Sequence, residues 1–157
     1  MLKRLIPPVQ EMPVCPDREW LHVDGLVEVE ISSETADHSI ESALLPGWSA
    51  GWRAARPGEQ TIRLIFTHPQ RLRRIWLNFI ERAAERTQEY VLRWSPDGGK
   101  VYHEIVRQQW NFSPRGSTAE AEDHRVDLRA VTVLELTIVP DTSGREACAS
   151  LAQLRLA

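Results

Sequence analysis

The sequence predicts an all-β protein, namely an antiparallel sandwich of eight strands preceded by an extended N-terminal arm. Three observations support this class. Most of the chain after Val27 consists of short runs rich in β-branched and aromatic residues. Turn-forming residues separate these runs, and apolar and polar residues alternate within several of them, as in strands with one buried face. Eight such strands suit two sheets packed face to face.

The chain of 157 residues is most economically one domain and is long enough to bury a sizeable core. Residues 1–26 are rich in proline and show no clear periodicity, so they are assigned to the arm. Residues 27–157 are assigned to a β-sandwich binding module.

The expected strands share alternating or continuously apolar patterns and are residues 27–33, 61–67, 72–80, 87–95, 101–110, 122–128, 133–139 and 148–156. In the second strand, Ile62, Leu64 and Phe66 would share one face. Such faces must be buried against another layer, which favours the sandwich.

The segment 81–86 leaves an alternative open. It contains good helix formers, and Ile75, Phe79 and Ala83 nearly fit a helical stripe, so an α+β fold is the second choice. The strand pattern of residues 90–94 and the lack of other convincing amphipathic helices favour the all-β class.

Residues 96–99, with the sequence Pro-Asp-Gly-Gly, predict a tight turn. Proline presets φ, aspartate bonds to the local backbone and glycine accepts a positive φ. The turn is expected to join strands 87–95 and 101–110 as a hairpin.

If consecutive strands reverse direction, their connections alternate between the two ends of the domain. One end then receives short connections, at residues 68–71, 96–100 and 129–132. The other end receives longer ones, at residues 34–60, 81–86, 111–121 and 140–147. Long loops held by a rigid frame often carry function, so a site is expected at this long-loop end.

The candidate ligand-binding residues are aromatic, basic or amide side chains near this end: His38, Trp48, Trp52, Arg53, Arg86, Asn111 and Arg115. Sugars are bound by an aromatic face, which packs on the ring, and by polar side chains, which bond to the hydroxyls. The competing interpretation is that the tryptophans, Trp110 among them, close the end of the sandwich as core residues.

The arginines near this end also have two interpretations. Arg53, Arg82 and Arg86 could form a site for a carboxylate or phosphate. Alternatively, they pair on the surface with the acidic residues Glu81, Glu85 and Glu89.

Composition and charge exclude several classes. With 19 Lys and Arg against 22 Asp and Glu, the net charge is −3, which argues against a nucleic-acid binder. No segment approaches the roughly 20 apolar residues of a membrane span, and no signal peptide is visible, so a cytoplasmic location is expected. Cys15 and Cys148 are then expected to be free, buried thiols.

Motifs for catalysis and metal binding are missing. The five histidines show no metal-ligand spacing, and no nucleophile elbow, phosphate loop or dinucleotide fingerprint occurs. We therefore expect no enzyme and no cofactor. A structural Ca²⁺ bound by Glu34, Asp37 and Glu41 is not favoured, because the spacing matches no calcium loop.

The span from Trp52 to Trp110 resembles discoidin-type modules, also called coagulation-factor C-type domains. The hairpin carries the most specific part of the resemblance, with Tyr90, Leu92, Ser95, Asp97 and Gly98 in the family's pattern. The family's Asp-Gly pair before the tryptophan is replaced by Ser-Ala-Gly in this sequence. The resemblance implies the galactose-binding-like fold, an eight-stranded jelly roll that binds ligands at one end, often carbohydrates.

These observations give a first hypothesis, a non-catalytic module that binds carbohydrate through the long loops. The alternative is a protein-interaction or assembly module, for which a dimer is one option, with outward apolar residues such as Trp76 and Ile80 on its surface. A hydrolase assembled from distant loops is the third and least supported reading, since sequence spacing alone does not exclude it.

Overall fold

The computed structural model describes residues 1–4 and 19–157, and every structural statement below refers to these residues. The elements are β1 (Val27–Ile31), α1 (Glu41–Leu44), β2 (Trp52–Arg53), β3 (Gln60–Ile80), β4 (Arg86–Ser95), β5 (His103–Phe112), β6 (Ala119–Val139), β7 (Ser150–Leu151) and β8 (Gln153–Leu156). The all-β prediction is confirmed. The α+β alternative is wrong, because residues 81–85 form a loop and the one helix in the described part is a single turn.

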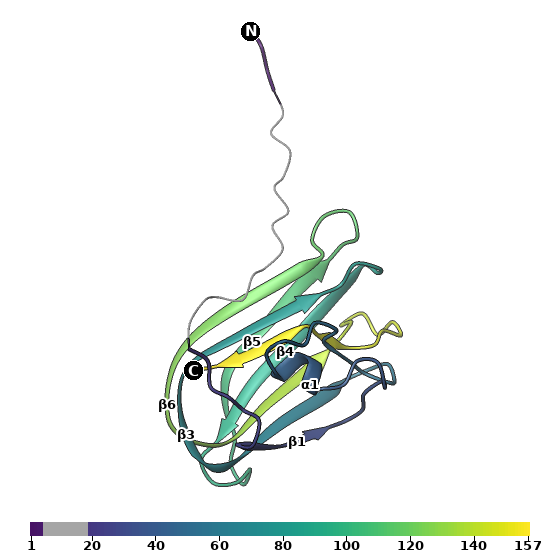
Figure 1. Ribbon diagram of the computed structural model, residues 1–157. Helices are drawn as coiled ribbons and strands as arrows, with labels where there is room; N and C mark the ends of the chain where they lie inside the picture. Colours follow the sequence, from purple (N-terminus) through teal and green to yellow (C-terminus); the bar gives the residue numbers. More distant parts are fainter. Residues whose placement is uncertain (5–18) are drawn as a thin grey trace.

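The strands are hydrogen-bonded in the order β1-β3-β6-β4-β5, with β8 also on β3, and β2 pairs separately with β7. All pairs are antiparallel. β3 and β6 are each 21 residues long and curve together around one side of the molecule (Figure 1). Their halves therefore belong to different layers, and the sheet closes over itself as a sandwich.

Two of the predicted turns were wrong. Residues 68–71 and 129–132 do not separate strands; they stay extended inside β3 and β6, where Gln70 pairs with Val131. The register shifts three times between Ile65 and Arg74, and such irregularities bend a strand. Pro69 lies in this irregular stretch, where a missing ladder donor is tolerated. The predicted last strand, 148–156, is likewise divided into β7 and β8.

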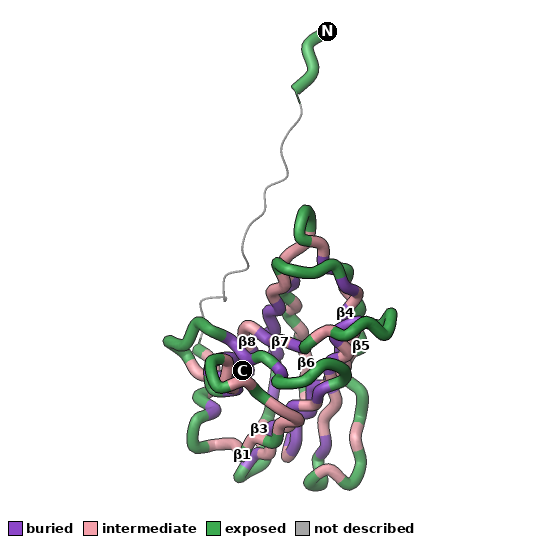
Figure 2. The backbone as a smooth tube through the Cα atoms, turned by 90° about the vertical axis from the view of Figure 1, so that its right-hand side faces the viewer, coloured by how far each residue is buried: buried purple, intermediate pink, exposed green. Residues whose placement is uncertain are grey.

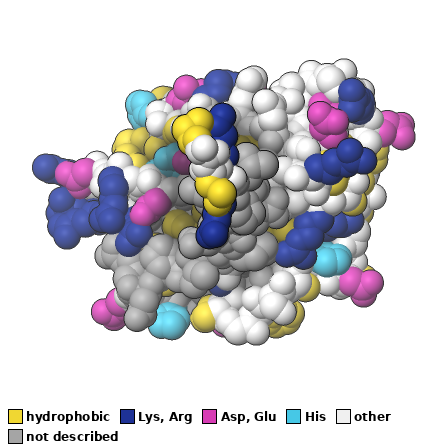
Figure 3. All heavy atoms as spheres, turned by 90° about the horizontal axis from the view of Figure 1, so that it is seen from above, with side chains coloured by type: hydrophobic (Ala, Val, Ile, Leu, Met, Phe, Trp, Pro, Cys, Tyr) yellow, Lys and Arg dark blue, Asp and Glu magenta, His cyan; other side chains and the backbone are white. Residues whose placement is uncertain are grey.

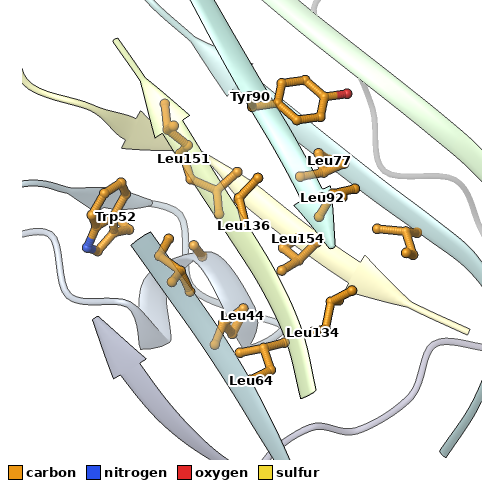
Figure 4. Packing of buried hydrophobic residues seen from close by; sticks show 14 of the residues in the cluster. Leu44, Trp52, Leu64, Leu77, Tyr90, Leu92, Leu134, Leu136, Leu151 and Leu154 are labelled. Carbon is orange, nitrogen blue, oxygen red and sulfur yellow. The ribbon is translucent and has the colours of Figure 1, made fainter. Parts of the chain in front are cut away.

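The core lies between the two layers. Figure 4 shows buried leucines from β3, β4, β6, β7 and β8, including Leu77, Leu92, Leu136 and Leu154, with Tyr90 among them. The rings of Phe79 and Tyr90 pack at 5.1 Å between centroids. Figure 2 shows the buried positions along the strands and the exposed ones in the loops.

The predicted arm and its boundary are described in part. Residues 5–18, which include Cys15, lie outside the described residues. Closer to β1, the Leu21 amide donates to the Leu156 carbonyl at 2.7 Å and Val23 is buried. The chain before Val27 therefore contributes contacts to the sandwich.

The predicted hairpin between β4 and β5 is confirmed. The Asp97 Oδ1 atom accepts hydrogen bonds from the Ser95 hydroxyl and from the amides of Lys100 and Val101. Gly98 and Gly99 have φ values of 76° and 96°, which a side chain would disfavour. The hairpin lies at the end of the molecule opposite the long loops (Figure 1).

Two surface predictions from the sequence are corrected. Trp76 is only 3% exposed and so cannot form part of an outward apolar surface. Cys148 is free as expected, but it is exposed rather than buried. No helix in the described residues is long and apolar enough to cross a membrane.

Candidate functional site

The long loops meet at one end of the sandwich, as the alternation of connections predicted. They project to the right and upper right of Figure 1, and Figure 2 views the molecule from that side. Two hollows open between them. One is lined by residues from the loop before β2, the loop after β3 and the β7–β8 segment; the other is lined by residues at the start of β4, the end of β5 and the loop after β6.

The first hollow has a volume of about 290 Å³ and is lined by His38, Arg53, Glu81 and Arg82, among others. The Nδ1 atom of His38 lies 2.9 Å from the Ala50 carbonyl, which can only accept, so Nδ1 carries the proton. The His38 carbonyl accepts from the Arg53 amide at 3.1 Å, which ties this loop to β2. The Arg53 side chain is exposed.

Glu81 shapes the wall that the loop after β3 contributes. Its Oε1 atom accepts from the amides of Ala83 and Ala84 at 2.8 and 3.1 Å, and its Oε2 atom lies 3.3 Å from Nε of Arg86. These bonds satisfy backbone donors of a segment that forms neither helix nor strand. The carboxylate of Glu81 is therefore structural.

Arg86 is a buried residue that connects several loops, rather than a surface residue. It is 4% exposed, donates through Nη1 to the Pro140 carbonyl at 3.0 Å and lies over the Phe112 ring at 5.3 Å. Burial lowers the pKa of its guanidinium, while the nearby Glu81 and Asp141 carboxylates oppose that effect. Arg86 thus links three loops, and its expected pairing with Glu81 is found, but in the interior rather than on the surface.

The tryptophans have different environments. Trp52 is 1% exposed and its indole nitrogen donates to the Ser33 carbonyl at 3.0 Å. Figure 4 shows it at one end of the buried cluster, so it closes the sandwich and has no free face for a ligand. Trp48 is 51% exposed, just before the residues 49–53 that line the first hollow. Trp110 is half-buried against the core.

The remaining predicted residues are placed apart from the first hollow. Asn111 is exposed at the end of β5 and lines the second hollow together with Arg86. Arg115 is exposed in the turn after β5 and lines neither hollow. The structure therefore brings His38, Trp52 and Arg53 together and separates them from Asn111 and Arg115.

Residues of the loop after β6 were not selected from the sequence. Asp141 Oδ1 accepts from the Ser143 amide at 3.0 Å and from its hydroxyl at 2.7 Å, and these bonds hold the pKa of Asp141 below its usual range. The Asp-Thr-Ser-Gly sequence of residues 141–144 is a turn signal, and the loop had been assigned to this end. Together these two signals could have identified Asp141.

Among the described residues, no group of three or more His, Cys, Asp or Glu side chains is placed to hold a metal ion. Glu34, one of the three candidate calcium ligands, accepts a hydrogen bond from the Ile40 amide at 2.8 Å.

The surface seen from above carries charges of both signs. Lys and Arg side chains occur there beside Asp and Glu side chains, so this face is neither uniformly positive nor uniformly negative (Figure 3).

The sequence matches no protein-family model and no curated protein. The structure, however, is similar to solved carbohydrate-binding modules. The family 32 module of NanJ from Clostridium perfringens, determined in complex with galactose, matches with a TM-score of 0.59 and 13% identity over 83% of this chain and 92% of that one. The family 32 module of AlyQ, in complex with 4,5-unsaturated mannuronic acid, matches with a TM-score of 0.62 and 14% identity over 84% of this chain and 95% of that one.

A family 29 fucosidase from Ruminococcus gnavus, in complex with fucose, matches with a TM-score of 0.63 and 8% identity over 84% of this chain. The chain spans 25% of the length of that enzyme. These matches confirm the sandwich fold that the sequence predicted. At such low identities they establish the fold alone.

Proposed function

We propose that this protein is a non-catalytic carbohydrate-binding module and that the first hollow is its ligand site. The observation that carries the proposal is an open, polar hollow among the long loops of a sandwich whose fold is shared with sugar-bound modules. The galactose and uronate-type ligands of those modules support a sugar as the ligand here.

The hollow offers the groups that such a ligand requires. Arg53 and Arg82 supply guanidinium donors for hydroxyl or carboxylate oxygens, and His38 supplies a ring nitrogen at the same surface. Trp48, which is exposed beside the hollow, supplies an aromatic face for the apolar side of a sugar ring. Because Trp52 is buried, Trp48 takes the role of the aromatic contact.

A thermal-shift screen of the full chain against a sugar panel that includes galactose, fucose and uronic acids tests the proposal. A sugar present at about 100 times its Kd should stabilise the fold by roughly 2.7 kcal/mol, which raises Tm by about 5–10 °C. If no sugar on the panel shifts Tm, the carbohydrate proposal fails and a protein partner becomes the leading hypothesis.

For the sugar that the screen selects, Arg53→Ala is expected to weaken binding about 10-fold to 100-fold, because charged hydrogen bonds contribute roughly 1.5–3 kcal/mol. Isothermal titration calorimetry measures the change in Kd. Arg115→Ala is the matched control, since it removes an exposed arginine that lines neither hollow and should leave Kd unchanged. Equal Kd values for Arg53→Ala and the unmodified protein would move the site away from this hollow.

A further inference from the structure

The second hollow has a volume of about 350 Å³ and borders the other end of the segment 81–86. Its walls come from three parts of the chain that are distant in sequence. The polar side chains that line it include Thr87, Asn111, Ser113, Asp141, Ser143 and Arg145. Most of this lining can form hydrogen bonds, which distinguishes it from a packing defect.

Asn111 is held in one orientation. Its Oδ1 atom accepts from the Thr87 hydroxyl at 2.7 Å, so the other end of the amide, Nδ2, carries the donors. Asn111 is exposed at the end of β5, and this fixed amide is therefore available to a ligand.

Asp141 supplies the complementary acceptor. Its Oδ1 atom is engaged by Ser143, and the same bonds keep the carboxylate ionised by lowering its pKa. The Thr87 backbone and the Arg145 guanidinium also lower the pKa of this carboxylate, of which 7% remains exposed. A carboxylate that accepts and an amide that donates match two hydroxyl groups of one sugar residue, since each hydroxyl can both donate and accept.

The walls of this hollow are fixed by the buried arginine beneath them. Arg86 is bonded to the Pro140 carbonyl, stacked on Phe112 and paired with Glu81, so it connects all three walls. Its Nη2 atom is buried and makes no hydrogen bond with the described residues. A site with pre-positioned walls loses less entropy when it binds a ligand.

A further hollow adjoins this one at the edge of the sheet. A third hollow, of about 470 Å³, is lined by Gln109, Trp110, Asn111 and Ser117, so Asn111 is common to both. β5 is the last strand in the sheet order, and Trp110 is half-buried there. Its indole Nε1 is buried and has no hydrogen-bond partner among the described residues.

We propose that Asn111 is the centre of a second sugar-binding site, separate from the first hollow, in which Asp141 and Asn111 bind hydroxyl groups of the sugar. The proposal rests on the carbohydrate-binding function proposed above. It also gives the exposed amide at the end of β5 a role beyond turning the chain.

The test is a titration of the uniformly ¹⁵N-labelled full chain with galactose and, separately, with fucose, followed by amide chemical shifts. Saturable shifts are expected in residues 109–117 and 141–145. Asn111→Ala should weaken binding at these amides about tenfold, as for loss of a hydrogen bond of about 1.4 kcal/mol, and should leave the shifts of residues 49–53 unchanged. Arg53→Ala should instead weaken binding at residues 49–53 and leave the shifts of residues 109–117 and 141–145 unchanged.

Each outcome decides between the two proposals. Shifts at both groups of amides support two sites. Shifts confined to residues 38, 49–53 and 80–83 overturn the second site and leave the proposed function intact. Shifts confined to the Asn111 region support the second site and overturn the assignment of the first hollow, and the absence of shifts with both sugars overturns the second site. If, in addition, no sugar on the panel raises Tm in the thermal-shift screen, the proposed function is overturned as well.

Discussion

Trp52→Ala is expected to lower the free energy of unfolding by about 3–5 kcal/mol, the range for removal of a fully buried tryptophan. The indole is 1% exposed, and its nitrogen donates to the Ser33 carbonyl, so the substitution removes core packing and leaves a carbonyl without its donor. In a chain of this length Tm should fall by roughly 6–20 °C. Urea denaturation monitored by circular dichroism measures the loss.

Trp48→Ala is the matched control, because it makes the same substitution in the same loop. Trp48 is 51% exposed, so its removal should change stability by about 0.5 kcal/mol or less and should instead weaken sugar binding. Equal stabilities for the two variants would show that Trp52 is not a core residue.

The burial of these two tryptophans could not be predicted from the sequence. Both lie in the long loop 34–60, each follows a glycine, and no local periodicity separates them. The difference arises because Trp52 lies on β2 and pairs with Leu151, near the other end of the chain. Contacts between such distant segments leave no periodicity in the sequence. The sequence therefore located the loop correctly but did not distinguish the buried ring from the exposed one.

Local patterns did predict the strands and the hairpin, because alternation and turn chemistry are properties of neighbouring residues. Arg86 shows the opposite case. Good helix formers and nearby glutamates predicted a surface charge, yet Pro140 and Phe112 enclose the side chain. The curvature of β3 was missed for a related reason, since His68 to Arg71 are polar and contain a proline, as a turn would. Their pairing with β6 keeps them extended.

The contribution of Glu120 to the stability of the protein is expected to fall as pH rises from about 4.5 to about 8. This residue on β6 is 3% exposed, and its two carboxyl oxygens have no hydrogen-bond partner in the described part of the chain. Burial, and then the neighbouring Glu122, raise the pKa of Glu120 from 4.5 to about 8. Tyr90 and His124, which are hydrogen-bonded to each other at 2.9 Å, are the other titratable groups near Glu120 and Glu122.

The sign follows from proton linkage. Between the two pKa values the folded state retains the Glu120 proton while the unfolded state releases it. Each increase of one pH unit therefore lowers the free energy of unfolding by up to about 1.4 kcal/mol. The loss ends above about pH 8, where both states are ionised. Burial also lowers the pKa of His124, so that group opposes folding only below its ordinary value, in acid.

Glu120→Gln keeps the shape of the side chain and removes the titrating proton. We expect this variant to exceed the unmodified protein in stability by a few kcal/mol at pH 8.5, with little difference near pH 4.5. Urea denaturation at pH 4.5, 7 and 8.5 measures the two curves, and Glu146→Gln, an exposed site, should follow the unmodified protein. Parallel curves for Glu120→Gln and the unmodified protein would mean that Glu120 is ionised in the fold. In that case the interior between the sheets near β6 must hold a compensating partner.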